Sequence, residues 1–227
     1  MVNREAMAKI LAQQQRFTDA DGELEAAARV GQALVGSDPH NTEFPAELSG
    51  VYTLMGQAEL QAGIGPAAEG HARRALDLAE TLVRKDPTVV DWQGRRLGGA
   101  RVLEMEARAQ QARGRAAFLA ALAGAPDEFR RLALLSQAHP HDLLISRIAS
   151  EAAVLAGDAR WVAGDKAGAD AVWAEGARIL EGAGGIEASN KSDRRRVVLT
   201  KLQERRQGRA DWQVGKGVGQ GLPKYLW

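Results

Sequence analysis

The sequence predicts an all-α protein built from antiparallel helical hairpins that stack side by side. Its 227 residues are rich in alanine, leucine, arginine, glutamine and glutamate, which form helices readily, whereas β-branched and aromatic residues are sparse. Short breaks containing proline or glycine separate the helical segments, so consecutive helices are expected to lie antiparallel. Two stretches also share one internal spacing of small residues, which indicates a repeated hairpin.

The expected helices follow the apolar periodicity along the whole chain. In order they cover residues 3–16, 21–36, 45–62, 66–85, 91–113, 115–123, 127–138, 142–163, 166–182 and 192–207. Each break has a local cause, because proline removes a helical donor and glycine loosens the backbone. The breaks fall at Asp38-Pro39, Gly63–Pro66, Asp86-Pro87, Gly124–Pro126, His139-Pro140 and Gly182–Gly185.

Two of these hairpins carry small residues at matching positions. In each, a glycine in the first helix is followed seven residues later by a turn glycine, and then by small or aromatic residues at helical spacing. The first set is Gly56, Gly63, Ala68, Ala72 and Ala75, and the second is Gly157, Gly164, Ala169, Trp173 and Gly176. Because a glycine in the first helix lets the second helix approach closely, we expect these residues to pack the repeats.

This pattern resembles the tetratricopeptide repeat (TPR) family, whose repeats carry a glycine in the first helix, a turn glycine, and alanine, an aromatic residue and alanine along the second. The resemblance implies a short right-handed solenoid of stacked hairpins. It covers about residues 20–185 and is fullest over Val51–Ala75 and Val154–Gly176. Two further stretches match in part, namely Gly22, Ala27, Gly31 and Leu34, and Ala107, Gly114, Leu119 and Ala123.

The four expected turn glycines lie farther apart than the usual period of about 34 residues. They are Gly22, Gly63, Gly114 and Gly164, separated by 41, 51 and 50 residues. With the Asp-Pro helix ends, this long period resembles the arrays found C-terminal to bacterial serine/threonine kinases and winged-helix regulators. The sequence contains neither a kinase glycine-rich loop nor a His-Arg-Asp catalytic loop. The resemblance therefore implies a scaffold or adaptor that binds a protein or peptide and is not an enzyme.

Composition favours a soluble cytoplasmic protein. There is no cysteine, so disulfides and thiolate metal sites are excluded. Residues 1–20 carry charges without an uninterrupted apolar segment, which is unlike a secretory signal. The longest apolar run, Ala116–Ala123, is far shorter than the roughly 20 residues that span a membrane. We expect no membrane partner.

Positive charge gathers near the C-terminus. From Lys191 onward there are ten basic and three acidic residues, giving +7, whereas the whole chain is +1 and the rest is therefore −6. We expect a repeat array over residues 1–190, followed over 191–227 by a basic helix that caps the array and a glycine-rich tail. The alternative is a nucleic-acid-associated protein that uses Arg194 to Arg209, because basic clusters also bind phosphates.

Three motifs invite a ligand interpretation, but each has a plainer structural one. His139–Asp142 could ligate zinc or iron, yet the segment is a helix connector in which Asp142 suits an N-cap. Gly215–Gly221 lacks the strand and helix that flank a phosphate-binding loop. Asp158, Asp165 and Asp170 lack the spacing of a calcium loop. We therefore expect no catalytic residue, no metal and no cofactor.

If the hairpins stack as in TPR proteins, the first helices of successive repeats line a concave groove. Residues of those helices that lie off the packing stripe would face a ligand. They are Thr53, Gln57, Glu104, Arg108, Gln111, Asp158 and Trp161. This set combines polar side chains with one aromatic anchor of the kind that contributes strongly to interfaces. The predicted ligand is an extended or helical peptide.

Overall fold

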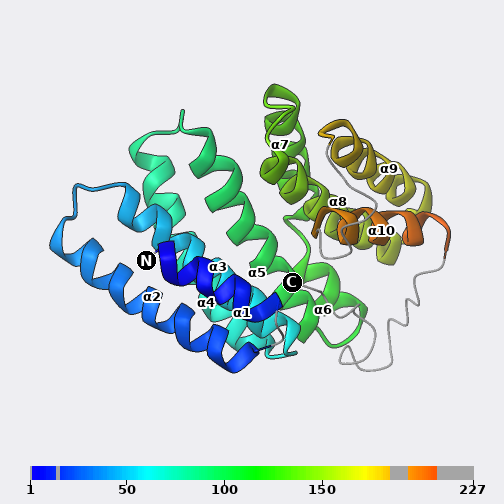
Figure 1. Ribbon diagram of the computed structural model, residues 1–227. Helices are drawn as coiled ribbons and strands as arrows, with labels where there is room; N and C mark the ends of the chain where they lie inside the picture. The colour runs from blue at the N-terminus through cyan, green and yellow to red at the C-terminus, as the bar shows by residue number, and fades with distance from the viewer. Residues whose placement is uncertain (1, 14–15, 185–193, 209–227) are drawn as a thin grey trace. The chain divides into compact units, whose positions relative to one another are not determined.

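The computed structural model describes residues 2–13, 16–184 and 194–208 and contains only helices and connectors within them, which confirms the all-α prediction (Figure 1). The elements are α1 Val2–Gln13, α2 Phe17–Ser37, α3 Glu43–Gln61, α4 Gly65–Lys85, η1 Trp92–Gly98, α5 Gly99–Gln111, α6 Gly114–Ala121, α7 Ala125–Ala138, α8 Leu143–Ala163, α9 Lys166–Gly182 and α10 Arg194–Arg206. The chain divides between Glu104 and Met105 into two compact units.

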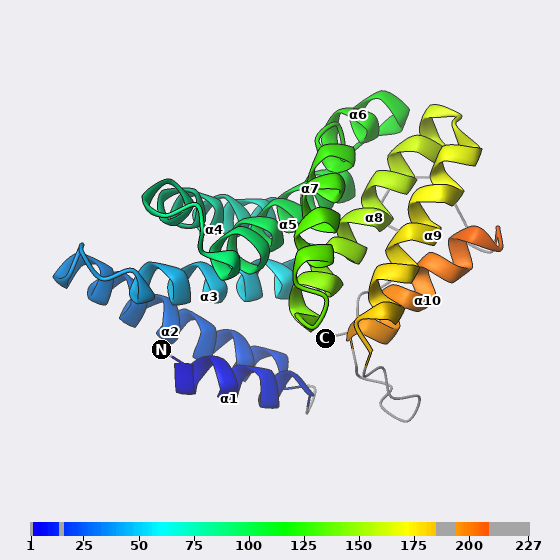
Figure 2. The same cartoon turned by 90° about the horizontal axis from the view of Figure 1, so that it is seen from above.

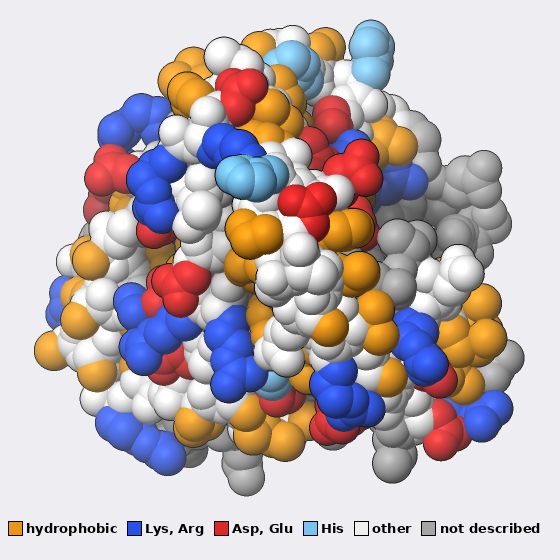
Figure 3. Space-filling model, turned by 90° about the vertical axis from the view of Figure 1, so that its left-hand side faces the viewer, with side chains coloured by type: hydrophobic (Ala, Val, Ile, Leu, Met, Phe, Trp, Pro, Cys, Tyr) orange, Lys and Arg blue, Asp and Glu red, His pale blue; other side chains and the backbone are white. Residues whose placement is uncertain are grey.

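In the first unit, each helix from α1 to α4 packs against the next helix in the chain (Figures 1 and 2). This neighbour-to-neighbour order follows from the short connectors, which leave consecutive helices antiparallel. On the face drawn in Figure 3, acidic and basic side chains are interspersed and do not gather into a patch of one sign.

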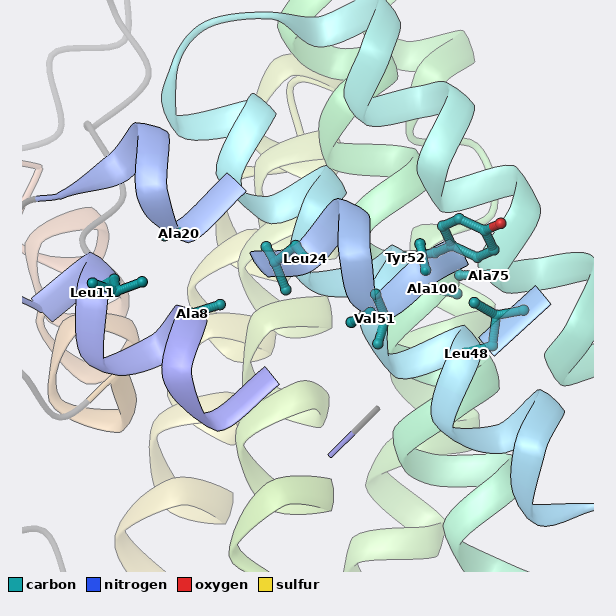
Figure 4. Close-up of a cluster of buried hydrophobic side chains, with 11 residues drawn as sticks. Ala8, Leu11, Ala20, Leu24, Leu48, Val51, Tyr52, Ala75 and Ala100 are labelled. Carbon is teal, nitrogen blue, oxygen red and sulfur yellow. The ribbon is translucent and has the colours of Figure 1, made fainter. Parts of the chain in front are cut away.

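The core of the first unit is built from small side chains with a few large ones between them (Figure 4). Leu11, Leu24, Leu48, Val51 and Tyr52 supply the large side chains. The remaining members are Ala8, Ala20, Ala27, Ala28, Ala75 and Ala100. Because alanine keeps helix axes close together, these few large residues are sufficient to fill the space between helices.

The α3/α4 hairpin is packed by the small residues expected from the sequence. Ala68, Ala72 and Ala75 have no exposed surface. A Cβ added at Gly56 would lie 2.7 Å from Leu103 Cδ2 and 3.1 Å from the Ala68 carbonyl oxygen, so glycine allows a close approach there. Gly63 turns the chain between the helices at a φ of +78°, which favours glycine.

The segment after α4 differs from the expected single helix over 91–113. Residues 92–98 wind as a π-helix, η1, and the α-helix α5 begins only at Gly99. Three buried glycines, Gly94, Gly98 and Gly99, fall in or next to this stretch. Their weak preference for the α-helix lowers the cost of the wider π-helical turn.

One expected turn glycine is not at a turn. Gly22 lies inside α2, which starts at Phe17, four residues earlier than predicted. Positive φ values occur instead at Gly63, Gly114 and Gly164 among the four. The assignment of Gly22 was wrong because a helix tolerates an exposed interior glycine at modest cost, so glycine alone does not mark a turn.

In the second unit, α8 is the central helix. It packs against α7, α9, α10 and α6, and most of its residues from Ile145 to Val162 are buried. Asp142 caps its N-terminus by accepting hydrogen bonds from the amides of Leu144 and Ile145, each at 3.0 Å. The carboxylate therefore has the capping role expected from the sequence.

The α8/α9 hairpin repeats the packing of α3/α4 with larger side chains. Gly157 on α8 faces the indole of Trp173 on α9, and a Cβ added there would overlap the ring. Trp173 is 1% exposed and Ala169 is fully buried. Gly176 lies against Ala153, and Gly164 forms the turn at a φ of +102°.

Each hairpin also contains a hydrogen bond from a serine of its first helix to a carbonyl of its second helix, which the sequence pattern did not include. Ser49 donates to the Ala75 carbonyl at 3.0 Å, and Ser150 donates to the Gly176 carbonyl at 2.8 Å. Ser150 follows Ser49 by 101 residues, as Gly157 follows Gly56 and Gly164 follows Gly63. Each buried serine therefore joins the first helix to the second at the same position, which strengthens the case for an internal repeat.

Replacing Gly157 with alanine should destabilise the protein by about 1–3 kcal/mol, because the new Cβ overlaps the Trp173 indole. Urea denaturation followed by circular dichroism measures the change. Gly70→Ala is the matched control, since Gly70 lies exposed within α4 with open space around it, and there alanine should raise stability by up to about 1 kcal/mol. Equal effects of the two substitutions would remove Gly157 from the helix contact.

Candidate functional site

The candidate site is the interface that α10 makes with α8 and α9 in the second unit. α10 packs against both helices (Figure 2). Its apolar contribution is small, since Val198 and Leu202 are the fully buried apolar residues of this helix. Leu202 fits against Gly176 of α9, where the absence of a side chain makes room for it. The rest of the buried α10 surface is charged.

A buried ion pair lies at the centre of this interface. Arg205 of α10 donates from Nε and Nη2 to the two carboxylate oxygens of Asp158 on α8, at 2.6 and 2.9 Å. Both side chains are only 3% exposed. Burial raises the pKa of Asp158, although the Arg205 guanidinium acts in the opposite direction. Asp158 therefore connects α8 with α10.

A second charged contact lies two turns earlier on α8. Glu151 accepts hydrogen bonds from Arg147 on its own helix at 2.6 Å and from Arg194 of α10 at 2.9 Å. Burial opposes the ionisation of Glu151, but Arg147, Arg194 and Lys201 outweigh it, and its pKa is lowered. Glu151 is therefore held as a carboxylate by cations from two helices.

Lys201 and Glu106 complete the cluster. Lys201 of α10 is buried, and this burial lowers its pKa to about 8, although Glu106 and Glu151 favour the charged form. Burial also raises the pKa of Glu106 on α5, against the attraction of Lys201. The cluster thus contains acidic residues from α5 and α8 and basic residues from α8 and α10. Removing one partner from such a cluster leaves an uncompensated buried charge.

The basic residues of α10 are engaged within the molecule. Besides Arg194 and Arg205, Arg206 donates to Asp170 of α9 at 3.1 Å, and Arg195 donates to the Gly184 carbonyl at 3.3 Å. Arg209 lies outside the described residues. Because these guanidinium groups already have acceptors, less of the positive charge of α10 is available to nucleic acid phosphates than the sequence suggested.

Trp161 lies one turn beyond Asp158 on α8 and is half-buried. Its ring centroid is 5.7 Å from that of Trp173, and Lys166 Nζ lies 5.2 Å from the Trp161 ring centroid. Trp161 therefore packs beside the buried Trp173, whose indole donates to the Val154 carbonyl at 3.4 Å. Asp158 itself does not face solvent while α10 covers it.

The remaining predicted groove residues have varied surroundings. In the first unit, Thr53 donates to the Ser49 carbonyl at 2.9 Å, Gln57 is half-buried on α3, and Glu104 lies 3.6 Å from Arg73 Nε. In the second unit, Arg108 is exposed on α5, and Gln111 donates to the Ala107 carbonyl at 3.1 Å. The structure brings Asp158 and Trp161 together around Trp173.

Sequence reasoning missed Arg147 and Glu151 altogether. It assigned the basic segment from Arg194 to Arg209 to a cap or to nucleic acid, without the buried acids that pair with it. A signal was present, since Glu151 and Asp158 are seven residues apart and lie on one helix face. Arg194, Lys201 and Arg205 have matching helical spacing in the basic segment.

A further contact was missed in the first unit. His71 Nδ1 lies 2.7 Å from Glu59 Oε2, and the His71 ring stacks on Tyr52. The two residues are twelve positions apart, on facing helices of one hairpin. The contact joins α3 to α4, and the sequence does not reveal it because the pairing depends on the register of the two helices.

Among the motifs considered for a metal ion, Asp142 and Asp165 serve as helix caps. Among the histidines and acids of residues 2–13, 16–184 and 194–208, no group is arranged to hold a metal ion. Asp165 caps α9 by accepting from the Gly168 amide at 2.8 Å. Gly215–Gly221 lies outside the described residues. Within the described helices, none has the length and apolarity needed to cross a bilayer.

Comparison with known proteins adds no assignment. No family model, no curated protein and no solved structure matches this chain.

Replacing Arg205 with alanine should cost about 3–5 kcal/mol of stability in the second unit, because Asp158 would stay buried without a counter-charge. The double variant Asp158→Leu, Arg205→Met should recover most of this loss. Urea denaturation followed by tryptophan fluorescence compares the three proteins. If the double variant is as unstable as Arg205→Ala, the loss comes from packing and not from the unpaired charge.

The contribution of Glu151 should depend on pH. Its folded-state pKa is lowered from the ordinary value of 4.5, so its stabilisation is present above pH 4.5 and is lost as the pH falls through the lowered value. The difference in unfolding free energy between the unmodified protein and Glu151→Gln should therefore shrink between pH 7 and pH 3. A constant difference over this range would contradict the assignment. Glu181→Gln, at the exposed end of α9, is the control.

Proposed function

We propose that this chain is a non-catalytic protein-interaction module, a TPR-like scaffold or adaptor that binds a peptide or helical segment of a partner. The observation that carries the proposal is the internal repeat. Two hairpins 101 residues apart share a glycine at the same position of the first helix, a turn glycine and a buried serine bond between helices. Repeated hairpins that bury one face against the next element are typical of binding scaffolds.

A second line of support is that each repeated hairpin is covered by a following helix. η1 packs against α4 and α3, with Arg96 Nη2 3.1 Å from Glu47 of α3. α10 packs against α9 and α8, with Arg194 on Glu151. In both hairpins an arginine of the following segment pairs with a glutamate of the first helix. The hairpin is thus a unit that accepts another helix through apolar contact and charge.

In the proposed module, Trp161 is the aromatic anchor for a partner. It is half-buried, with Trp173 behind it and Lys166 beside it. An aromatic ring held in place by its neighbours loses little conformational entropy on binding, which favours a large contribution to affinity. Thr53, Gln57, Glu104, Arg108 and Gln111 are the proposed polar contacts.

The test is affinity capture from an extract of the source cells, followed by cross-linking that maps the contact on the full chain. Trp161→Ala should weaken capture of a protein partner at least tenfold while the helical circular dichroism stays unchanged. Leu134→Ala is the matched control, because Leu134 is a 62% exposed apolar residue on α7, and its loss should not affect capture. Equal capture by all three proteins, or recovery of nucleic acid alone, would contradict the proposal.

A further inference from the structure

The surface of α8 and α9 beneath α10 recognises a helix through a small set of matched side chains. Two acids on α8, Glu151 and Asp158, receive Arg194 and Arg205 of α10. Between these contacts, Leu202 fits against Gly176. All of these contacts are made by α10 side chains, so a helix from another molecule with the same side chains would make the same contacts.

The side chains that α10 presents follow one stripe. Arg194, Val198, Leu202 and Arg205 lie at positions i, i+4, i+8 and i+11 of the helix, which places them on one face. Glu151 and Asp158 are two turns apart, so they fix the positions of the two arginines. The recognised pattern is therefore an apolar stripe with an arginine at each end and the buried Lys201 beside it.

The charged side chains of this interface lose hydration when α10 packs on α8 and α9. Burial acts against ionisation at these groups, because the pKa values of Asp158 and Glu106 are raised and that of Lys201 is lowered. Each shift favours the neutral form. The attraction between the paired charges is thus offset in part by lost hydration. The net free energy that binds α10 to α8 and α9 is therefore smaller than the short distances suggest. A competing helix that presents the same side chains needs only to exceed this net binding free energy.

We propose that the α8–α9 face is a binding site for an amphipathic helix of a partner protein with an arginine at each end of an apolar stripe, and that α10 occupies this site until such a helix displaces it. This inference rests on the proposed function and names the chemistry of the partner. The free energy of partner binding would be reduced by that of releasing α10, which makes α10 an internal competitor.

The test uses a fluorescent peptide of residues 194–208 as the probe, added to the full chain. Leu202→Asp in the full chain should release α10, because it places a charge against Gly176 and Ala153. The peptide should then bind this variant at least tenfold more tightly than the unmodified protein, in which the tethered helix competes at an effective concentration of about 1 mM. Gln203→Asp, on the exposed side of α10, should behave like the unmodified protein.

A peptide carrying Arg205→Ala is the specificity control and should lose at least tenfold in affinity for the Leu202→Asp variant. The melting temperature of that variant is read in parallel, since a bound peptide raises it even where release of α10 has loosened the hairpin. The inference is overturned if the two peptides bind alike, or if about 1 mM peptide neither binds nor raises the melting temperature.

These outcomes separate the two proposals. Failure of the peptide assay, with partner capture still dependent on Trp161, overturns the role of α10 and leaves the interaction module standing. Failure of partner capture, with the peptide still binding in the predicted order, removes the support for a partner protein and leaves only an intramolecular helix contact.

Discussion

Asp158 loses its hydration when α10 packs over α8, and the second unit depends on how that loss is offset. The carboxylate receives hydrogen bonds from both Nε and Nη2 of Arg205. It therefore fixes the rotation of α10 on α8. A charge pair of this kind specifies geometry more than it adds net stability, since much of its attraction is offset by desolvation.

The small residues set how closely the helices of each hairpin approach. Gly56 and Gly157 leave space for Leu103 and Trp173 respectively, and the serine bonds from Ser49 and Ser150 fix the register between the helices. The element that packs on each hairpin is different. The π-helix η1 packs on α3/α4, whereas the basic helix α10 packs on α8/α9.

Much of the fold could be predicted from the sequence, because helix propensity, proline breaks and the spacing of small residues all act locally. The N-cap role of Asp142 and the turns at Gly63 and Gly164 are of this kind. The π-helical turn at η1 and the helical position of Gly22 were missed, since both depend on tertiary packing. The contacts of Arg205 with Asp158 and of His71 with Glu59 depend on which helix faces meet, which one sequence does not specify. The ligand of the proposed groove remains a prediction.

Hydrogen exchange of the α10 amides, read by mass spectrometry on the unmodified protein at neutral pH, tests the central claim most directly. If the Asp158–Arg205 pair holds α10 on α8 and α9, peptides from residues 194–206 should exchange far more slowly than an unfolded segment, and Asp158→Asn should accelerate them while α7 stays protected. Exchange of residues 194–206 at the unfolded rate, with α8 and α9 protected, would contradict the account.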